Sequence, residues 1–177
     1  MKKLIAIATL GLASSAFAGS WLSVDSEPVH GLKGGANSNA TYVRAGTDVD
    51  GLALGLQNRT ARFNDGSVVS SLEATVGKGL GVFTPYVGVG HDYGSKTASA
   101  YNYGLVGGQL GTQVGPGFAL LGAKTRIRES EKDPKQTVTY ATYSIPLNKQ
   151  FAVNLNASHS SQDINERALG VGLKVNF

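Results

Sequence analysis

One short segment of the sequence brings together side chains that could carry out a reaction, His159-Ser160-Ser161. A histidine that removes the proton of a nearby serine turns that serine into a nucleophile for acyl esters. Residues two apart in an extended strand point to the same face, which would place His159 and Ser161 side by side. We therefore treat His159 and Ser161 as the candidate catalytic pair of the chain.

The His159-x-Ser161 pair is similar to the H-x-S motif of outer-membrane lipid A deacylases. That resemblance implies an esterase in which His159 activates Ser161 toward an acyl ester. It covers two residues, because that family continues with asparagine after its serine and this chain has Gln162. Glu166, the acid considered for orienting the histidine, falls on the opposite face by parity. We expect that the chain is not an enzyme, and a lipid A deacylase-like esterase remains the alternative function.

Other catalytic and metal-binding motifs are missing from the sequence. It has no G-x-S-x-G elbow, no H-E-x-x-H helix, no phosphate-binding P-loop and no cysteine. The histidines His30, His91 and His159 lack the spacing of metal ligands. The net charge of +4 falls to +2 once Lys2 and Lys3 are removed with a signal peptide, too small an excess to favour nucleic acid. We expect no cofactor, no metal site and no nucleic-acid partner.

The end of the chain, residues 169–177, alternates strictly between two kinds of side chain. Large apolar residues occupy the odd positions, and Gly, Lys and Asn occupy the even ones. Such a strand has one apolar face and one polar face. Ending on an aromatic residue, it resembles the C-terminal assembly signal of bacterial outer-membrane β-barrels. The resemblance implies that the barrel-assembly machinery recognises these side chains: Leu169, Val171, Leu173, Val175 and Phe177.

The beginning of the chain has the features of an export signal. Lys2 and Lys3 precede the apolar stretch Leu4–Leu12, and small residues follow up to Ala16-Phe17-Ala18. A charged region, a short apolar region and an A-x-A site together predict a cleavable signal peptide. We therefore expect residues 1–18 to be removed and residues 19–177 to form a single β-barrel domain.

Composition restricts how such an exported chain could enter a membrane. Outside the signal region, no apolar run approaches the roughly 18 residues that a spanning helix needs. In hydrocarbon the backbone can be satisfied only within helices or closed barrels. Twenty-four glycines without a collagen period also fit the alternating strands of a barrel. Composition thus favours an all-β membrane protein, and the resemblance of residues 169–177 to the barrel assembly signal implies the outer membrane of Gram-negative bacteria.

Strands and turns can be placed along the chain. Asp50-Gly51 is a two-residue hairpin signal, and Val49 and Leu52 flank it in the correct register. Nine strands read clearly, and a weaker one covers Ser20 to about His30. We prefer a closed, antiparallel, up-and-down transmembrane β-barrel of ten strands, and a barrel of eight strands is the alternative. A soluble β-sandwich is the second fold considered. The clear strands are expected at 41–49, from 52, 68–76, 80–92, 101–112, 118–128, 137–145, 151–159 and 169–177.

The connections between these strands alternate in length. Short turns such as Asp50-Gly51 and Pro146–Gln150 alternate with longer or charged loops such as Glu129–Lys135. Bacterial barrels have short periplasmic turns and longer outer loops, so we expect both termini in the periplasm. Aromatic residues fall near the strand ends, where membrane barrels collect them in girdles.

The polar face of the strands would line the barrel interior. Buried charges need partners, so a lumen packed with paired groups is favoured over an open pore, which appears at about sixteen strands. A mild cationic excess predicts that any residual conductance prefers anions. The charged residues expected in the lumen are Arg44, Asp48, Arg59, Glu73, Asp92, Lys124, Arg126 and Lys174, joined by Gln57, Asn154, Asn156 and Asn176.

Taken as a whole, the chain resembles the broad group of opacity-type, porin-like and OmpA-type outer-membrane barrels. That resemblance implies a structural, surface-interaction or narrow-pore role in the cell envelope. Outer-membrane lipid and lipopolysaccharide are the expected partners, beside the assembly machinery. Ligand and oligomeric state stay open.

Overall fold

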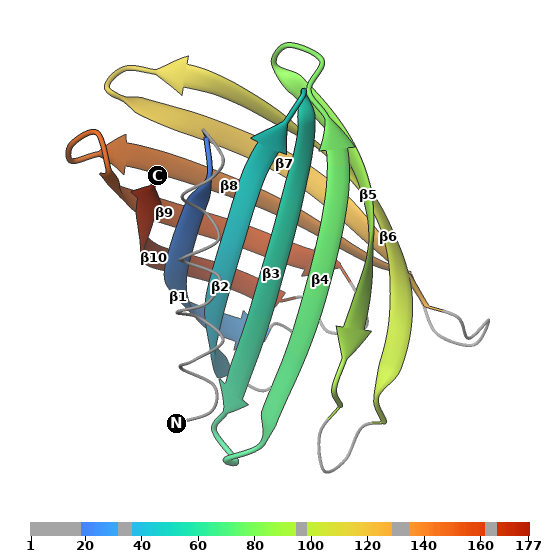
Figure 1. Cartoon of the computed structure of the whole chain (residues 1–177). Helices are drawn as coiled ribbons and strands as arrows, with labels where there is room; N and C mark the ends of the chain where they lie inside the picture. Colours follow the sequence, from blue (N-terminus) through green and yellow to red (C-terminus); the bar gives the residue numbers. More distant parts are fainter. Residues whose placement is uncertain (1–18, 32–36, 95–98, 129–134, 162–165) are drawn as a thin grey trace.

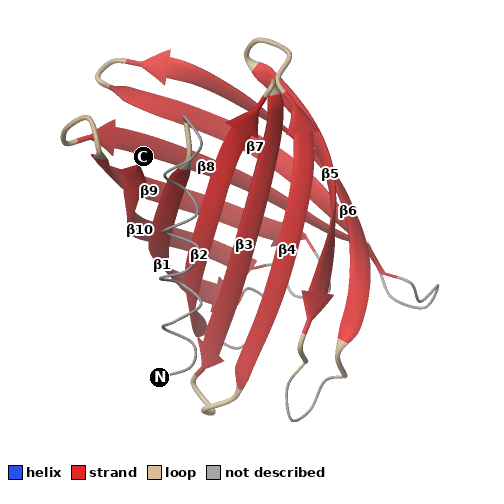
Figure 2. Ribbon diagram, viewed as in Figure 1, coloured by secondary structure: helices blue, strands red, loops and turns tan. Residues whose placement is uncertain are grey.

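Ten antiparallel strands close into a barrel in the computed structural model (Figure 1). The structure describes residues 19–31, 37–94, 99–128, 135–161 and 166–177. Every regular element within those ranges is a strand (Figure 2). The preferred fold, an all-β barrel of ten strands, is confirmed. The strands are β1 (Trp21–Gly31), β2 (Ser38–Val49), β3 (Leu52–Phe63), β4 (Val68–Lys78), β5 (Phe83–Asp92), β6 (Tyr101–Val114), β7 (Gly117–Arg128), β8 (Gln136–Pro146), β9 (Phe151–Ser161) and β10 (Glu166–Asn176).

The barrel closes between its first and last strands. β1 pairs with β2 on one side and with β10 on the other, and Trp21 lies opposite Asn176. The amide of Phe177 donates a hydrogen bond of 2.9 Å to the carbonyl oxygen of Ser20. The C-terminus therefore lies beside the start of β1 (Figure 1). All ten strands have two neighbours, so the ring has no open edge.

The Asp50-Gly51 hairpin forms as expected. Both residues have positive φ, 54° and 77°, as a turn of this kind requires. Val49 and Leu52 face each other across it, and Asp48 accepts a hydrogen bond from the Gly51 amide at 3.0 Å. A long registered pairing of β2 with β3 follows from this tight turn.

Some strand ends differ from the sequence prediction. β2 begins at Ser38 rather than Thr41, because Ser38 and its neighbours still pair with the end of β3. β5 begins at Phe83 rather than Leu80, because the Leu80 amide donates to the Phe83 carbonyl oxygen at 2.8 Å and closes a turn there.

The loop at residues 64–67 is held by Asp65, which accepts hydrogen bonds from the amide and the hydroxyl of Ser67. These bonds lower the pKa of the Asp65 carboxyl.

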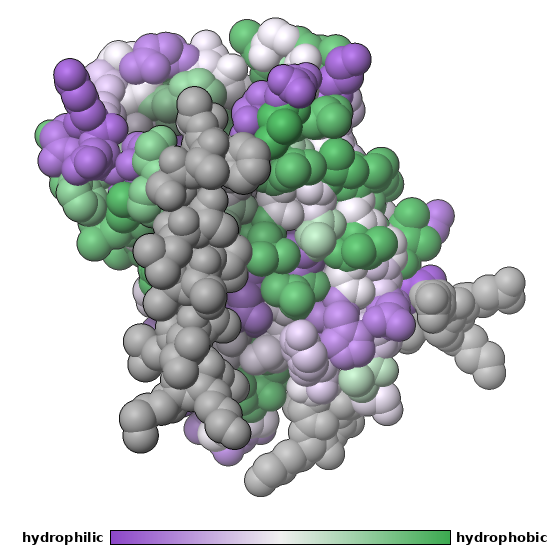
Figure 3. Space-filling model, viewed as in Figure 1, coloured by the Kyte–Doolittle hydropathy of each residue, from purple (hydrophilic) through white to green (hydrophobic). Residues whose placement is uncertain are grey.

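The outer wall of the barrel is apolar. Leu169, Val171 and Leu173 of the terminal strand point outward and are more than half exposed. Exposed large apolar side chains also project from the outer faces of β1, β3, β4, β5, β6, β7 and β9. Hydrophobic side chains gather over the middle of the wall in view, and hydrophilic ones toward its ends (Figure 3). A soluble sandwich would bury such a surface, whereas a membrane barrel exposes it to lipid.

Among the described residues, no helix is long and apolar enough to cross a membrane.

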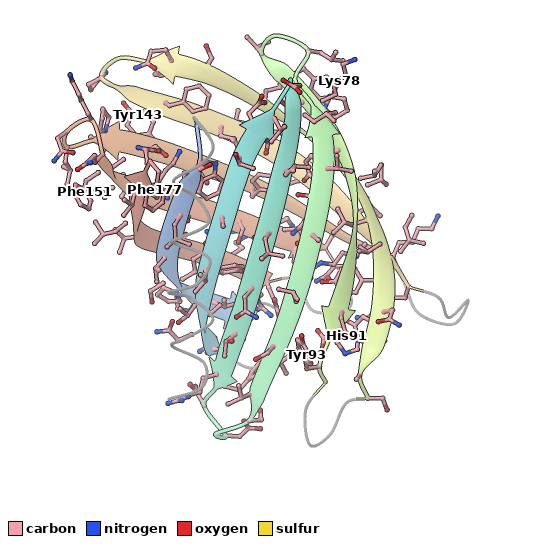
Figure 4. All side chains as sticks on the ribbon, in the orientation of Figure 1. Lys78, His91, Tyr93, Tyr143, Phe151 and Phe177 are labelled. Carbon is pink, nitrogen blue, oxygen red and sulfur yellow. The ribbon has the colours of Figure 1, made fainter. Side chains whose placement is uncertain are left out.

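The aromatic residues near the strand ends divide between the two faces of the wall. Tyr143 and the phenylalanines at 151 and 177 point outward at the end that carries the short turns, and His91 and Tyr93 lie at the other end (Figure 4). Six others share the face of the polar lumen residues, which the prediction of an interfacial girdle did not foresee. They pair across strands with inward groups: Trp21, Tyr42, Phe63, Tyr101, Tyr103 and Phe118.

Candidate functional site

The residues predicted for the lumen share the inward face of the barrel. The register of the strands places them on one side of the wall, and they line two cavities inside it. Some meet in one network and others stand apart. Arg44, Glu73, Lys124 and Arg126 belong to the network. Arg59, Asp48 and Lys174 stand outside it: Arg59 donates to the Tyr42 hydroxyl, Asp48 holds a turn, and Lys174 lies over the Trp21 ring.

Arg44 of β2 organises the first half of the network. Its guanidinium contacts the carboxylates of Asp25 at 2.7 Å and Glu27 at 3.1 Å, both on β1. Both carboxylates are almost fully buried. Asp25 also accepts hydrogen bonds from Asn156 at 2.8 Å and Asn154 at 3.3 Å, on the far side of β10. Two buried acids are thus held by one arginine and by the amides of β9.

Glu73 of β4 organises the second half. It is almost fully buried and forms ion pairs with Lys124 and Arg126 of β7, which is three strands away around the barrel. The Arg126 Nε donates to Glu73 at 2.8 Å, and the Tyr103 hydroxyl donates to it at 3.0 Å. These bonds cross the interior, because β4 and β7 are not neighbours in the sheet. One carboxylate therefore ties two sides of the barrel together.

Neutral amides join the two halves. Gln57 accepts from Arg44 at 3.0 Å and donates to Glu73 at 3.2 Å. On the other side, Arg126 donates to Gln136, which donates to Ser160 of β9, each at 2.8 Å. The connected groups encircle and cross the lumen, and we call them the lumen belt. The lumen belt consists of Asp25, Glu27, Arg44, Gln57, Glu73, Lys124, Arg126, Gln136, Asn154, Asn156 and Ser160.

Glycines on the inward face leave space for the side chains of the lumen belt. A Cβ built on Gly172 would collide with the Asp25 carboxylate, and one on Gly170 would collide with Glu27. These two β10 glycines let the acids of β1 lie across β10 toward the amides of β9. Gly90 of β5 does the same for the ring of Tyr103. The inward glycines are thus spaces into which neighbouring side chains fold.

Two cavities flank the lumen belt. One, of about 400 Å³, is lined by residues of β1–β3 and β6–β10, among them Arg59, Gln136 and Glu166. The other, about 290 Å³, lies beside the short turns near Thr84. Arg44 and Lys124 line both. The interior is therefore partly hollow, and groups of the lumen belt separate its hollow parts.

The predicted cationic excess of the lumen is not present in the described residues. Six basic and six acidic side chains face inward there, because the structure adds three acids, Asp25, Glu27 and Glu166, to the predicted lumen set but only one basic residue, Arg128. The basis for an anion preference disappears with them. The basic residues are Arg44, Arg59, Lys124, Arg126, Arg128 and Lys174; the acidic residues are Asp25, Glu27, Asp48, Glu73, Asp92 and Glu166.

His159 and Ser161 lie on the same face of β9, as predicted, and the register shows that this is the outward face. The Ser161 hydroxyl donates to the Thr137 carbonyl oxygen at 3.2 Å. Glu166 pairs with Ser160 and so lies on the inward face. Among the described residues of β8, β9, β10 and β1, no carboxylate shares the outward face with His159. The described structure places no acid where it could orient this histidine.

The predicted assembly signal consists of the odd-numbered residues from Leu169 to Phe177. Its first four residues lie on the outward face of β10, and Phe177 follows the end of that strand. Leu169 and Val171 lie opposite Ala157 and Leu155 of β9, so the alternation continues onto the neighbouring strand. The predicted signal peptide, residues 1–18, lies outside the described residues.

Comparison with known proteins identifies the fold. No family model and no curated protein sequence matches the chain. Among solved structures, the translocator domain of the autotransporter NalP from Neisseria meningitidis is similar at 12% identity, over 99% of this chain and 97% of that one, with a TM-score of 0.51. The KdgM porin is similar at 11% identity, over 88% of this chain and 99% of that one, with a TM-score of 0.50. The chain has the fold of small outer-membrane β-barrels.

Proposed function

We propose that this chain is an integral barrel of the outer membrane, with its short turns and both termini in the periplasm. The wall supports this, because its described outward face is apolar in the middle and aromatic at the end with short turns. Aromatic girdles of this kind sit at the membrane interface in bacterial barrels. A cleaved signal at residues 1–18 and an assembly signal ending at Phe177 would deliver the chain there.

Within that setting, we propose a structural barrel whose lumen is a narrow, obstructed passage. The observation that carries this is the ionic crossing between Glu73 on β4 and its basic partners on β7. Ion pairs across an interior of ten strands leave no continuous wide channel, and the cavities on either side of the crossing are each smaller than about 500 Å³. Small ions could pass between the cavities only when side chains of the lumen belt move.

Single-channel recording tests the obstruction. The refolded full chain in a planar bilayer should conduct weakly and without strong ion selectivity, since the lumen charges balance. The double substitution Glu73→Ala and Lys124→Ala removes one carboxylate and one ammonium together and should raise the conductance severalfold. Thr112→Ala, on the outward face of β6, is the control and should leave conductance unchanged. A wild type that conducts as strongly as the double variant would contradict the proposal.

Epitope labelling tests the orientation separately. A tag inserted after Lys132 should be labelled on intact cells, because the proposed topology puts the charged stretch 129–135 outside the cell. A tag at Leu147–Lys149, in a short turn, should be labelled only after the outer membrane is permeabilised. The reverse pattern would contradict the proposed topology.

A further inference from the structure

Charge is distributed unequally between the two faces of the barrel wall. Every acidic side chain on the described strands points inward, so the described outward face carries none. Basic and imidazole side chains do occur outward, and all but Lys78 stand near the end with the longer loops. They are His30, Arg62, His91, His159 and Arg167. At the loop end, the described strands thus place cations but no acid on the outer wall, which allows this part of the wall to attract anions.

Three of these side chains are immediate neighbours. His30 of β1 lies opposite Arg167 of β10, and Arg167 lies opposite His159 of β9. Directly opposed residues of antiparallel strands have Cβ atoms about 5 Å apart. The three side chains therefore form a continuous row across three strands. We call the row His30–Arg167–His159 the basic row.

The basic row stands at a depth where a lipid headgroup would lie. From Arg167 to Phe177, β10 advances ten residues, or about 33 Å at about 3.3 Å per residue. A tilt of about 40° reduces this to about 25 Å along the barrel axis, which is the height of the apolar band in bacterial barrels. If the aromatic Phe177 marks one membrane interface, Arg167 marks the other.

The hydrogen-bond donors of the basic row are not used within the described chain. No hydrogen bond or ion pair of the His30 or Arg167 side chain is made with another described residue, and both are exposed. The Nδ1 atom of His159 also has no hydrogen-bond partner among the described residues, but it is buried, so only the rest of this half-buried ring can face a ligand outside the wall. A guanidinium offers five N–H donors, and an imidazole offers at least one in either charge state. A phosphate has several acceptor oxygens and could accept hydrogen bonds from the Arg167 guanidinium and from the imidazole nitrogens that are not buried.

We propose that the basic row binds the phosphate group of an anionic membrane lipid in the leaflet at the loop end. This rests on the proposed membrane location, and it adds a specific lipid site to it. The acyl chains of that lipid would lie along the apolar side chains directly toward the turn end, Leu169 on β10 and Ala157 on β9, which face each other. One lipid molecule would then place its phosphate against the basic row and its acyl chains against the apolar surface beside it.

Lipid selectivity measured by electron paramagnetic resonance tests the site. The full chain is refolded into phosphatidylcholine vesicles that contain a trace of spin-labelled phosphatidic acid or spin-labelled phosphatidylcholine. The wild type should immobilise phosphatidic acid about fivefold more strongly at this site, because one basic residue near an anionic headgroup contributes about 1 kcal/mol. The triple variant His30→Gln, Arg167→Gln and His159→Gln should lose most of that preference.

Two further variants keep the result interpretable. Arg62→Gln removes an outward cation at the same end of β3, away from the basic row, and should retain most of the preference. Arg167→Lys keeps the charge and should also retain most of it. Equal preference in the wild type and the triple variant, or an equal loss with Arg62→Gln, would overturn the site. Loss of the preference on adding inorganic phosphate would assign it to a free anion and overturn the lipid assignment.

Failure of the two proposals can be told apart in the same samples. If the wild type does not insert and fold in the vesicles, the membrane function and the lipid site are both contradicted. If it inserts but shows no preference for phosphatidic acid, only the lipid site is contradicted.

Discussion

The inward and outward faces of this barrel are built from the same strands but differ in charge: the inward face carries many charged side chains, and the outward face is mostly apolar. The inward face of the described strands holds six acids and six bases, and three of each are joined in ion pairs. The outward face of the described strands carries no acid and is apolar through its middle. Alternation along each strand separates the two sets at every step. The comparison teaches that the most deeply buried charges lie where partners reach them and that the middle of the described outward face carries no charge, so substitutions of the same kind should differ sharply between the faces.

The largest expected effect comes from breaking the lumen belt on one side only. Arg44→Met leaves the buried carboxylates of Asp25 and Glu27 without their guanidinium. Removing one partner of a buried ion pair costs about 3–5 kcal/mol. The free energy of unfolding, from urea titration of the protein in vesicles, should fall by that amount. Arg59→Met is the control: its described partner is the Tyr42 hydroxyl, so a loss as large as that of Arg44→Met would contradict the assigned role of the ion pairs.

A charge placed on the outward face should have the next largest effect. Val171→Arg puts a guanidinium among lipid chains near the middle of the apolar band, at a cost of about 2–4 kcal/mol. Thr137→Arg, at the loop end of β8, should cost about 0–1 kcal/mol. The same urea titration measures both. Equal costs at the two positions would mean that the outer wall does not cross a lipid layer at this depth.

Replacing a glycine on the inward face should lower the free energy of unfolding by a smaller amount. Gly172→Ala brings a methyl group into the Asp25 carboxylate, whereas Gly104→Ala, on the outward face of β6, meets nothing within 4 Å. Overpacking a filled site costs about 1–3 kcal/mol. The unfolding free energy should fall in that range for Gly172→Ala and stay nearly constant for Gly104→Ala. A neutral Gly172→Ala would show that Asp25 can move without loss.

The faces of most strands could be predicted from the sequence, because alternation reports directly which side chains share a side. Leu52, Leu54 and Leu56 fix the outward face of β3, and the Asp50-Gly51 turn then fixes its register with β2. β1 was the exception. Its outward positions include Ser26, Pro28 and His30, so apolar alternation fades in its second half, and the inward acids of this strand were not identified.

The partners inside the lumen could not be predicted at all. Alternation along a strand shows which face a side chain occupies, but it does not show which distant strand that side chain will meet inside the barrel. Glu73 meets Lys124 and Arg126, more than fifty residues away, only because the wall curves enough between β4 and β7 for their side chains to meet inside the closed barrel. The glycines of β10 were visible in the sequence, yet their use as space for Asp25 depends on the closure of β10 against β1.

The division between the faces can be measured most directly with spin labels. Because the chain has no cysteine, single cysteines introduced one at a time along β8 can each carry a label in vesicles. Labels at Thr139, Ala141 and Tyr143 should collide readily with oxygen, which dissolves in lipid. Labels at Val138, Tyr140 and Thr142 should be far less accessible to it. This period of two is the predicted result; equal oxygen accessibility at Ala141 and Thr142, or a water-soluble nickel complex reaching Ala141 as readily as oxygen does, would contradict it.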